Sequence, residues 1–212
     1  MRRPTIIFDF GNVIAYFDFE KATTKLGARL GLSGRELLDR LEPVGFGVLL
    51  QRFERGEFTA VAFTQQASDL ISLVITHEEF AAAWGDIFTA NDSIIPVVEA
   101  LKHQGYRLVV GSNTNDLHAA RFREQFASTL AHFDRLVLSY EVGHLKPHRD
   151  FYLACAAAAG AEPGDCIFID DLEENIAGAW AAGLLGVVYR TTPELIADLA
   201  NLGVAFDSTQ AG

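Results

Sequence analysis

The sequence has few cysteines, no long apolar run and a deficit of positive charge. Its 212 residues include two cysteines, Cys155 and Cys166, which is too few for the disulfide framework of a small secreted domain, so we expect both thiols to be reduced and buried. No run approaches the roughly 18 apolar residues of a membrane span. Near the N-terminus, Asp9 interrupts the apolar stretch before it reaches the roughly 7 to 15 residues of a signal peptide. We therefore expect a cytoplasmic protein with no membrane partner.

The shortage of positive charge narrows the classes of partner. The chain has 17 Lys and Arg against 28 Asp and Glu, giving a net charge of −11. Nucleic acids and anionic membranes require a basic face, so a nucleic-acid partner is not expected. Hydrophobic residues make up 50% and charged residues 21% of the chain, an ordinary globular balance. The length suffices for one large domain or for a core with a smaller inserted domain.

What the sequence does contain is a series of short apolar segments, each followed by a helical pattern. The segments are rich in Val and Ile, as expected for strands buried on both faces. They are residues 5–10, 107–113, 135–140, 166–171 and 186–190. Helical patterns cover residues 94–104, 115–127, 148–160, 173–183 and 193–201, and Gly105, Gly160 and Gly183 stand where helices should end. This alternation predicts an α/β fold with a Rossmann-like parallel sheet covered by helices on both sides.

Residues 15–92 interrupt the alternation. They show helical patterns and no convincing strand, and "SGRE" (33–36) and "THEE" (76–79) have the spacing of capping boxes. A connection of this length far exceeds an ordinary crossover. We therefore predict a core domain of residues 1–14 and 93–212, with a helical cap domain of residues 15–92 inserted after the first strand.

Polar residues collect at the carboxyl ends of the predicted strands, where open parallel sheets bind their ligands. The first strand ends at Asp9 and the second at Ser112 and Asn113. Lys146 follows the third strand, and the fourth ends in the pair Asp170 and Asp171. We expect these side chains to meet at one edge of the sheet.

Together these groups suit the chemistry of a phosphate ester. Carboxylates from separate strands can hold Mg²⁺, which prefers oxygen ligands. The cation and Lys146 would neutralise a dianionic group, Ser112 would bind its oxygens, and Asp9 could attack the phosphorus. Taken singly, each residue also has an ordinary structural interpretation: Asp9 as a turn former or helix cap, Lys146 as a surface residue, and the acidic pair as the cap of the next helix. The coincidence at the ends of parallel strands favours the functional interpretation.

The motifs that carry these residues resemble those of a known superfamily. "FDFGNVI", "VVGSNTN", "GHLKPHRDFY" and "CIFIDDLEENIAGAWAAG" resemble the four motifs of haloacid dehalogenase (HAD) superfamily phosphatases with a helical cap after the first strand. The resemblance covers essentially the whole chain, and the fourth motif is its most specific part. "FERGEFTAVAF" (53–63) resembles the cap of sugar-phosphate phosphatases, above all bacterial enzymes that act on α-D-glucose 1-phosphate.

The resemblance implies a hydrolase of small phosphorylated metabolites that depends on Mg²⁺. It implies that Asp9 forms an aspartyl-phosphate and also binds the metal, together with the carbonyl of Gly11, with Asp171 and with Asp170 as ligand or support. It further implies that Ser112 and Asn113 bind the phosphate group and that Lys146 steadies the nucleophile and the substrate.

Gly11 departs from the pattern and keeps other interpretations open. Most phosphatases of the superfamily carry a second Asp at this position, which protonates the leaving oxygen, so the sequence leaves the general acid unassigned. A 2-haloacid dehalogenase also lacks that Asp, but it needs no metal, and the acidic pair favours the phosphatase. A catalytically silent binding protein on the same fold is a further alternative. A signalling receiver domain has similar residues in a different order along the chain.

The cap should select the substrate. Three residues in it, Arg52, Arg55 and Trp84, could contact a ligand. The two arginines are better interpreted as solvated, and Trp84 as part of the core, so none of the three is a predicted site residue.

Overall fold

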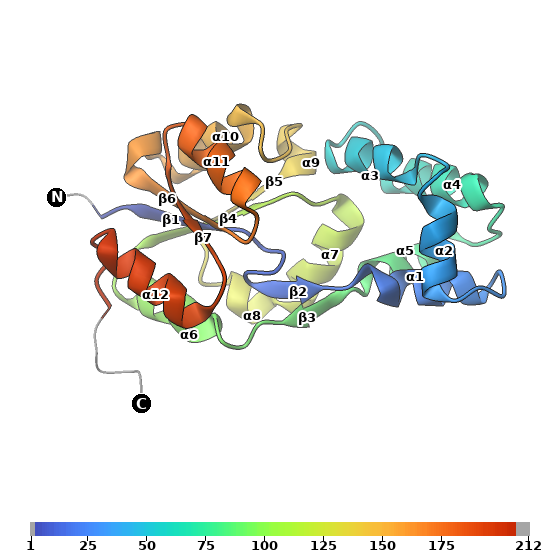
Figure 1. Ribbon diagram of the computed structural model, residues 1–212, viewed down its shortest axis with the longest axis horizontal. Coiled ribbons are helices and arrows are strands. Elements are labelled where there is room, and N and C mark those ends of the chain that lie inside the picture. Colours follow the sequence, from blue (N-terminus) through green and yellow to red (C-terminus); the bar gives the residue numbers. More distant parts are fainter. Residues whose placement is uncertain (1–2, 207–212) are drawn as a thin grey trace.

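The computed structural model describes residues 3–206 and contains a five-stranded parallel sheet at the centre of the larger lobe (Figure 1). The strand order is β5-β4-β1-β6-β7, which places β1 in the middle. The strands are β1 (Thr5–Phe8), β4 (Arg107–Ser112), β5 (Arg135–Leu138), β6 (Cys166–Asp170) and β7 (Leu185–Val188). All five predicted strands are therefore present, and the α/β fold class is confirmed.

Side chains that alternate along the strands create two apolar layers. Ile6 and Phe8 belong to the cluster on one face of the sheet, and Ile7 belongs to the cluster on the other face. Helices α10 (Arg149–Ala159) and α11 (Glu173–Ala181) cover the face of Ile7. The opposite face carries α6 (Ile95–His103), α7 (Asp116–Gln125), α8 (Ala127–Leu130) and α12 (Thr192–Asn201). The result is the three-layer arrangement that the sequence pattern predicts.

Three helices of the core end near the glycines at which the sequence predicts their ends. Gly105, Gly160 and Gly183 all have positive φ, at 79°, 60° and 93°, and a residue without Cβ adopts this backbone at the lowest cost. Two short elements complete the core, α9 (Ser139–Val142) and the 3₁₀ helix η1 (Pro163–Asp165). Cys155 and Cys166 are both buried and free, as expected.

The insertion after β1 forms a separate helical lobe, on the right in Figure 1. Its helices are α1 (Phe19–Ala28), α2 (Gly34–Leu41), α3 (Phe46–Glu54), α4 (Ala60–Ile71) and α5 (His77–Gly85). Both predicted capping boxes are present: Ser33 with Glu36 opens α2, and Thr76 with Glu79 opens α5. Each box satisfies backbone N–H groups that the first helical turn leaves without partners.

A two-stranded ribbon joins the lobes, which corrects the expectation that residues 15–92 contain no strand. Strand β2 (Ala15–Phe17) pairs antiparallel with β3 (Phe88–Ala90). Three-residue strands are too short to show an alternating pattern, so the sequence does not reveal them. They become recognisable only through the pairing of two segments that lie far apart in the chain. The domain boundaries at residues 14/15 and 92/93 stay a prediction. Over residues 3–206, no helix has both the length and the apolar character needed to cross a lipid bilayer.

Candidate active site

Asp9 lies directly beyond β1, at the carboxyl edge of the central strand. Its backbone N–H donates to the carbonyl of Ile169 at 2.8 Å, which extends the pairing between β1 and β6 by one residue. Its Oδ1 accepts a hydrogen bond from the N–H of Phe10 at 2.6 Å. The side chain is almost fully buried, and this burial raises the pKa of Asp9 above its usual range, although the nearby Lys146 ammonium acts in the opposite direction.

Lys146 lies between two carboxylates from neighbouring strands. Its Nζ is 2.8 Å from Oδ1 of Asp9 and 2.7 Å from Oδ2 of Asp170, and its side chain is 1% exposed. Burial by itself would lower the pKa of Lys146, but the two carboxylates outweigh burial and the pKa is raised. The ammonium form therefore persists in the interior. The interpretation of Lys146 as a solvated surface residue is wrong.

The acidic pair divides into two roles. Asp170 is fully buried, and its Oδ1 accepts hydrogen bonds at 2.9 Å from the N–H of Leu172 and from Nδ2 of Asn175, while its Oδ2 accepts from Lys146. Asp171 is half-buried and lines the pocket, where Oδ2 accepts from Nδ2 of Asn12 at 3.0 Å. Burial raises the pKa of Asp171, although the hydrogen bond from Asn12 opposes the shift. Asp171 thus faces the ligand space, while Asp170 holds Lys146.

Ser112 and Asn113 follow β4 and line the same pocket. The Asn113 side chain makes a reciprocal pair with the backbone of Lys146: Oδ1 accepts from the Lys146 N–H at 2.8 Å, and Nδ2 donates to the Lys146 carbonyl at 3.1 Å. Ser112 is buried, and its hydroxyl donates to the carbonyl of Asn113 at 3.3 Å. In addition to lining the pocket, Asn113 therefore fixes the loop that presents Lys146.

Gly11 and Asn12 form the turn after Asp9. Asn12 has a φ of 56°, a left-handed conformation that Asn tolerates better than most residues. Its N–H donates to the carbonyl of Ala15 at 2.7 Å, which closes the turn. A Cβ at Gly11 would lie 3.0 Å from Cε1 of Phe17, so the ring of Phe17 fills the space that a side chain at position 11 would need.

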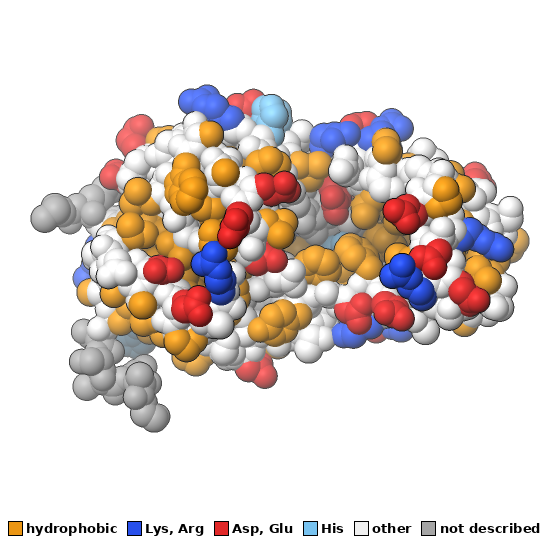
Figure 2. All heavy atoms as spheres, in the orientation of Figure 1, with side chains coloured by type: hydrophobic (Ala, Val, Ile, Leu, Met, Phe, Trp, Pro, Cys, Tyr) orange, Lys and Arg blue, Asp and Glu red, His pale blue; other side chains and the backbone are white. Residues whose placement is uncertain are grey.

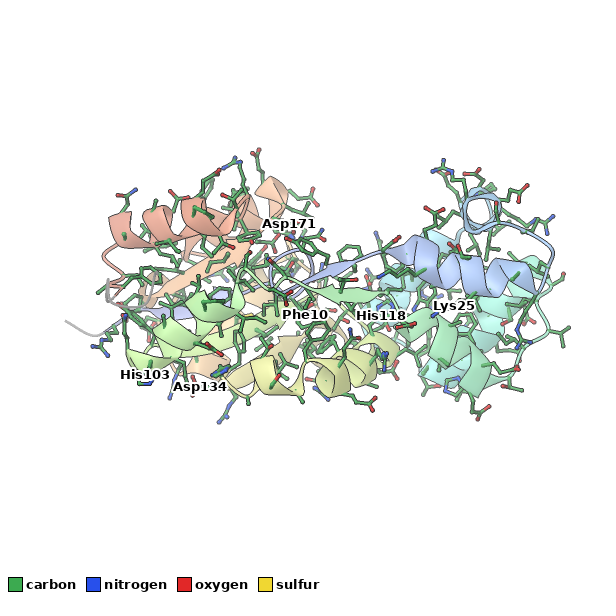
Figure 3. All side chains as sticks on the ribbon, turned by 90° about the horizontal axis from the view of Figure 1, so that it is seen from below. Phe10, Lys25, His103, His118, Asp134 and Asp171 are labelled. Atoms are coloured by element: carbon green, nitrogen blue, oxygen red, sulfur yellow. The ribbon has the colours of Figure 1, made fainter. Side chains whose placement is uncertain are left out.

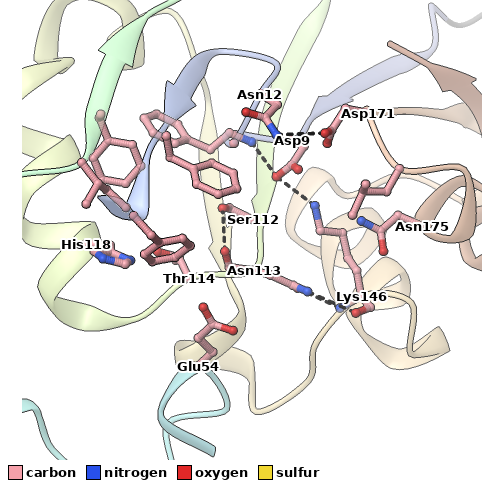
Figure 4. Close-up of a pocket in the computed structure, with 17 residues that line it drawn as sticks. Asp9, Asn12, Glu54, Ser112, Asn113, Thr114, His118, Lys146, Asp171 and Asn175 are labelled. Carbon is pink, nitrogen blue, oxygen red and sulfur yellow. Dashed lines mark hydrogen bonds and ion pairs between the residues drawn. The ribbon is translucent and has the colours of Figure 1, made fainter. Parts of the chain in front are cut away.

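These residues surround one pocket of about 260 Å³ between the core and the cap. Figure 2 shows the surface hollowed at this junction, and Figure 3 places Asp171 on the core side with His118 nearer the cap. The predicted residues that line the pocket are Asp9, Gly11, Ser112, Asn113, Lys146 and Asp171 (Figure 4); Asp170 is not part of the lining. Toward the cap, the apolar part of the wall comes from Phe17 and Phe88 of the ribbon, from Phe19 of α1 and from Ile87, which precedes β3.

The carboxylates suit a hard divalent cation. Ligand atoms of Asp9, Asp170 and Asp171 all lie within 4.8 Å of one another. Burial raises the pKa of Asp9 and of Asp171 although Lys146 acts in the opposite direction, so the ionised carboxylates would gain from a further positive charge. Oxygen donors with uncompensated negative charge are the ligands that Mg²⁺ prefers. The residues present therefore fit a magnesium ion.

Two ionisable residues of the pocket were not predicted. His118 is buried and lies between the carbonyl of Trp84, 3.2 Å from Nε2, and Nδ2 of Asn115, 3.0 Å from Nδ1. Burial lowers its pKa to about 4. Glu54, the last residue of α3, reaches the pocket from the cap. It belongs to the motif "FERGEFTAVAF", but a Glu at the end of a helix is usually solvated, so no pattern in the sequence indicates its burial.

Arg52, Arg55 and Trp84 of the cap do not line the pocket. Arg52 and Arg55 pair with Glu57, at 2.7 Å and 2.9 Å. Trp84 is 2% exposed and packs in the core of the cap, as expected.

Comparison with known proteins agrees with this architecture. The family of haloacid dehalogenase-like hydrolases matches residues 4–183. The chain therefore belongs to this family, and it has the core and the inserted helices that the resemblance implied.

Individual relatives share most of the chain. A D-ribitol-5-phosphate phosphatase of Bacteroides thetaiotaomicron is 30% identical over 178 residues, covering 81% of this chain and 84% of the relative. A phosphatase of Mycobacterium tuberculosis is 25% identical over 98% of both chains. The crystal structure of a HAD family enzyme from B. thetaiotaomicron, in complex with magnesium and inorganic phosphate, superimposes with a TM-score of 0.74 at 21% identity, covering 89% of this chain and 95% of that one.

Proposed function

We propose that the protein is a Mg²⁺-dependent phosphomonoester hydrolase that acts on a small phosphorylated metabolite. The observation that supports this most strongly is the buried Asp9 carboxylate at the end of the central strand, with an ammonium group 2.8 Å away and Asp171 on the same pocket. The two relatives named as phosphatases, one of them specific for a sugar-alcohol phosphate by its name, support the same class of reaction.

In the proposed reaction Asp9 attacks the phosphorus of the bound ester. The bond between phosphorus and the leaving oxygen breaks as the bond to Oδ of Asp9 forms, which gives an aspartyl-phosphate. Water then attacks the phosphorus, releases inorganic phosphate and restores the Asp9 carboxylate. Lys146 holds Asp9 in place and neutralises charge on the phosphate group, and Ser112 and the backbone around Asn113 bind its oxygens.

The proposed metal site consists of Asp9, the carbonyl of Gly11 and Asp171, with Asp170 in a supporting position behind Lys146. When bound, Mg²⁺ offsets the negative charge of the carboxylates and of the substrate. The structure of the B. thetaiotaomicron enzyme with magnesium and phosphate makes Mg²⁺ the first ion to test.

The pocket volume of about 260 Å³ suits a small ester better than a macromolecule. We propose sugar phosphates and sugar-alcohol phosphates as the substrate class. Glucose 1-phosphate and ribitol 5-phosphate are the first compounds to compare, because the cap motif resembles that of glucose-1-phosphate phosphatases and the named relative acts on ribitol 5-phosphate.

The test measures phosphate release from a panel of small phosphomonoesters, with Mg²⁺ and with excess EDTA. We expect release with Mg²⁺, loss in EDTA and recovery when Mg²⁺ is restored. Asp9→Asn should abolish release because an amide is a poor nucleophile, while Asp92→Asn, which changes an exposed carboxylate outside the pocket, should behave as wild type. Phosphate release by purified Asp9→Asn would refute the assignment of Asp9. Conversion of a 2-haloacid in EDTA would instead identify a dehalogenase.

A further inference from the structure

Glu54 enters the pocket from the side opposite the sheet. It is the last residue of α3 in the cap, and its carboxyl group points into the pocket, across from Asp9 (Figure 4). Within residues 3–206 it has no hydrogen-bond or ion-pair partner. The two nearby cations on the same segment, Arg52 and Arg55, both bind Glu57 instead, at 2.7 Å and 2.9 Å. Glu54 is therefore a half-buried carboxyl group that faces the ligand space without a counter-ion.

Three features of this position favour the protonated form. Burial raises the pKa of Glu54 from 4.5 to about 7. The carboxyl group also stands at the C-terminal end of α3, where the helix dipole disfavours negative charge. The pocket already contains the carboxylates of Asp9 and Asp171, and a dianionic ester would add to their charge. At neutral pH a substantial part of the molecules therefore carries a proton on Glu54.

The elements packed against α3 do not change this conclusion. Helix α4 contributes Asp69, which accepts a hydrogen bond from Gln65 at 2.8 Å. Helix α9 contributes Glu141, which pairs with Arg123 at 2.8 Å, and Tyr140, whose pKa is raised to about 12 by burial. Neither helix offers Glu54 a free cation.

The other ionisable residues that line the pocket are less suited to give a proton to a substrate. His118 is neutral, and both of its ring nitrogens are engaged by Trp84 and Asn115. Lys146 is held by two carboxylates, which raise its pKa and strengthen its hold on the proton. Asp9 and Asp171 are occupied as proposed nucleophile and metal ligand.

The chemistry of the proposed reaction requires such a proton. An alcohol that leaves as an alkoxide is a poor leaving group, and protonation of its oxygen in the transition state accelerates cleavage by about 10²- to 10⁴-fold. The attacking and leaving oxygens lie roughly in line through the phosphorus, so an attack by Asp9 from the sheet directs the leaving oxygen toward the cap. Position 11 has no side chain, and the ring of Phe17 occupies the adjacent space.

We propose, on the basis of the function proposed above, that Glu54 is the general acid of this enzyme and is supplied by the cap. As Asp9 Oδ bonds to phosphorus, the electron pair of the breaking bond passes to the leaving oxygen, which takes the proton of Glu54 and departs as an alcohol. Glu54 is then a carboxylate. It regains a proton from solvent before the next turnover, and the water that attacks the aspartyl-phosphate leaves with both of its hydrogens on the released dihydrogen phosphate.

The experiment compares two leaving groups in wild type and in Glu54→Gln. Gln keeps the size of the side chain and its capacity for hydrogen bonding but cannot transfer a proton. p-Nitrophenolate leaves readily without protonation, whereas a sugar or sugar-alcohol alkoxide does not. We expect Glu54→Gln to lower kcat by about 10²-fold or more for an alkyl phosphate and by less than about fivefold for p-nitrophenyl phosphate. In the wild type, kcat for the alkyl ester should fall as pH rises through the pKa of Glu54, and this fall should be absent in the variant.

Glu42→Gln is the matched control, because Glu42 also stands at the C-terminal end of a cap helix but is exposed. It should leave both rates unchanged. Equal loss of both activities in Glu54→Gln, unchanged kinetics, or a change confined to KM would each overturn the role as general acid. If the wild type with Mg²⁺ releases phosphate from neither ester, the proposed function itself fails, and this result is distinct from the other three.

Discussion

Replacing Lys146 by Met removes the one buried ammonium of the site while keeping much of its apolar stem. In the wild type, Nζ lies 2.8 Å from Asp9 and 2.7 Å from Asp170, and its side chain is 1% exposed. Lys146→Met therefore leaves two buried carboxylates side by side without a cation. The hydrogen bonds of the Lys146 backbone to Asn113 do not involve the side chain and should persist.

The loss of stability follows from this burial. Removal of one partner from a buried ion pair costs about 3–5 kcal/mol in free energy of unfolding, because the remaining charge is left uncompensated. For a chain of 212 residues, each 1 kcal/mol corresponds to roughly 2–4 °C in Tm, so the metal-free variant should melt roughly 6–20 °C below wild type. Turnover should also fall by about 10²-fold or more, since preorganised charge is usually a large term in catalysis.

The assay is thermal unfolding followed by circular dichroism, with and without Mg²⁺, together with phosphate release. Added Mg²⁺ should raise the Tm of the variant by more than that of wild type, because the dication replaces part of the missing positive charge. Lys102→Met is the matched control: its pair with Asp134 is also 2.7 Å long, but both side chains are about one-third exposed, so its loss should cost less than about 1 kcal/mol. A metal-free Tm for Lys146→Met equal to that of Lys102→Met would refute the reasoning.

Two further predictions concern the cap. A Cβ on Gly56 would lie 2.2 Å from the carbonyl oxygen of Tyr140 in the core, so Gly56→Ala should push the cap away from the core and impair turnover. Gly45 also has a positive φ but faces open space, so Gly45→Ala should show only backbone strain. Equal kinetics for the two variants would contradict the contact between Gly56 and Tyr140. For Glu54 the folded pKa, about 7, lies above 4.5, so its contribution to stability is complete below about pH 4.5 and is lost as pH rises through 7. The free energy of unfolding of Glu54→Gln, relative to that of wild type, should therefore increase by roughly 3 kcal/mol between pH 4.5 and pH 8. Denaturant unfolding at several pH values across this range measures the difference. A difference that does not change with pH would show that Glu54 is not buried as described.

The sequence predicted the sheet and its polar edge because both depend on local patterns. Apolar strands that end in Asp9 and in the acidic pair could be recognised without any contact information. Topology then brings the strand ends together, because parallel strands of one sheet present their carboxyl ends on the same side. The functional interpretation and the surface interpretation of Lys146 differ in its burial, and its two buried ion pairs exclude the surface interpretation.

The different positions of Asp170 and Asp171 could not be predicted from the sequence. Asp170 is the last residue of β6 and continues the alternation of the strand, which places it on the same face as Phe168 and Lys146. Asp171 comes after the strand, where the backbone is free to turn toward the pocket. Asp170, which supports Lys146, and Asp171, which lines the pocket, thus differ only in lying before and after the end of β6. Sequence patterns do not locate strand ends to an accuracy of one residue.

Glu54 was missed for a different reason. Its burial depends on how the cap docks on the core, and this docking involves segments far apart in the chain: the end of α3 meets α9 through Gly56 and Tyr140. On an isolated helix the same Glu would be solvated. Residues whose environment is created only by the closure of two lobes leave no periodic signal in either lobe.

The charge of the site explains how an acidic protein can bind an anionic ester. The net charge of −11 repels a phosphate dianion at long range, and three carboxylates with one ammonium leave the site itself negative. A bound divalent cation removes this excess on the side of the sheet, where the phosphate group would lie. On the side of the cap, Phe17, Phe19 and Ile87 keep the wall apolar, and at neutral pH a substantial part of the molecules carries a proton on Glu54, which reduces the charge that this side adds. The charged side at the sheet thus suits the phosphate group of an ester, and the apolar side at the cap suits its alcohol part. Salt screens the long-range repulsion between protein and ester but acts little on buried groups. Added salt should therefore raise kcat/KM rather than lower it.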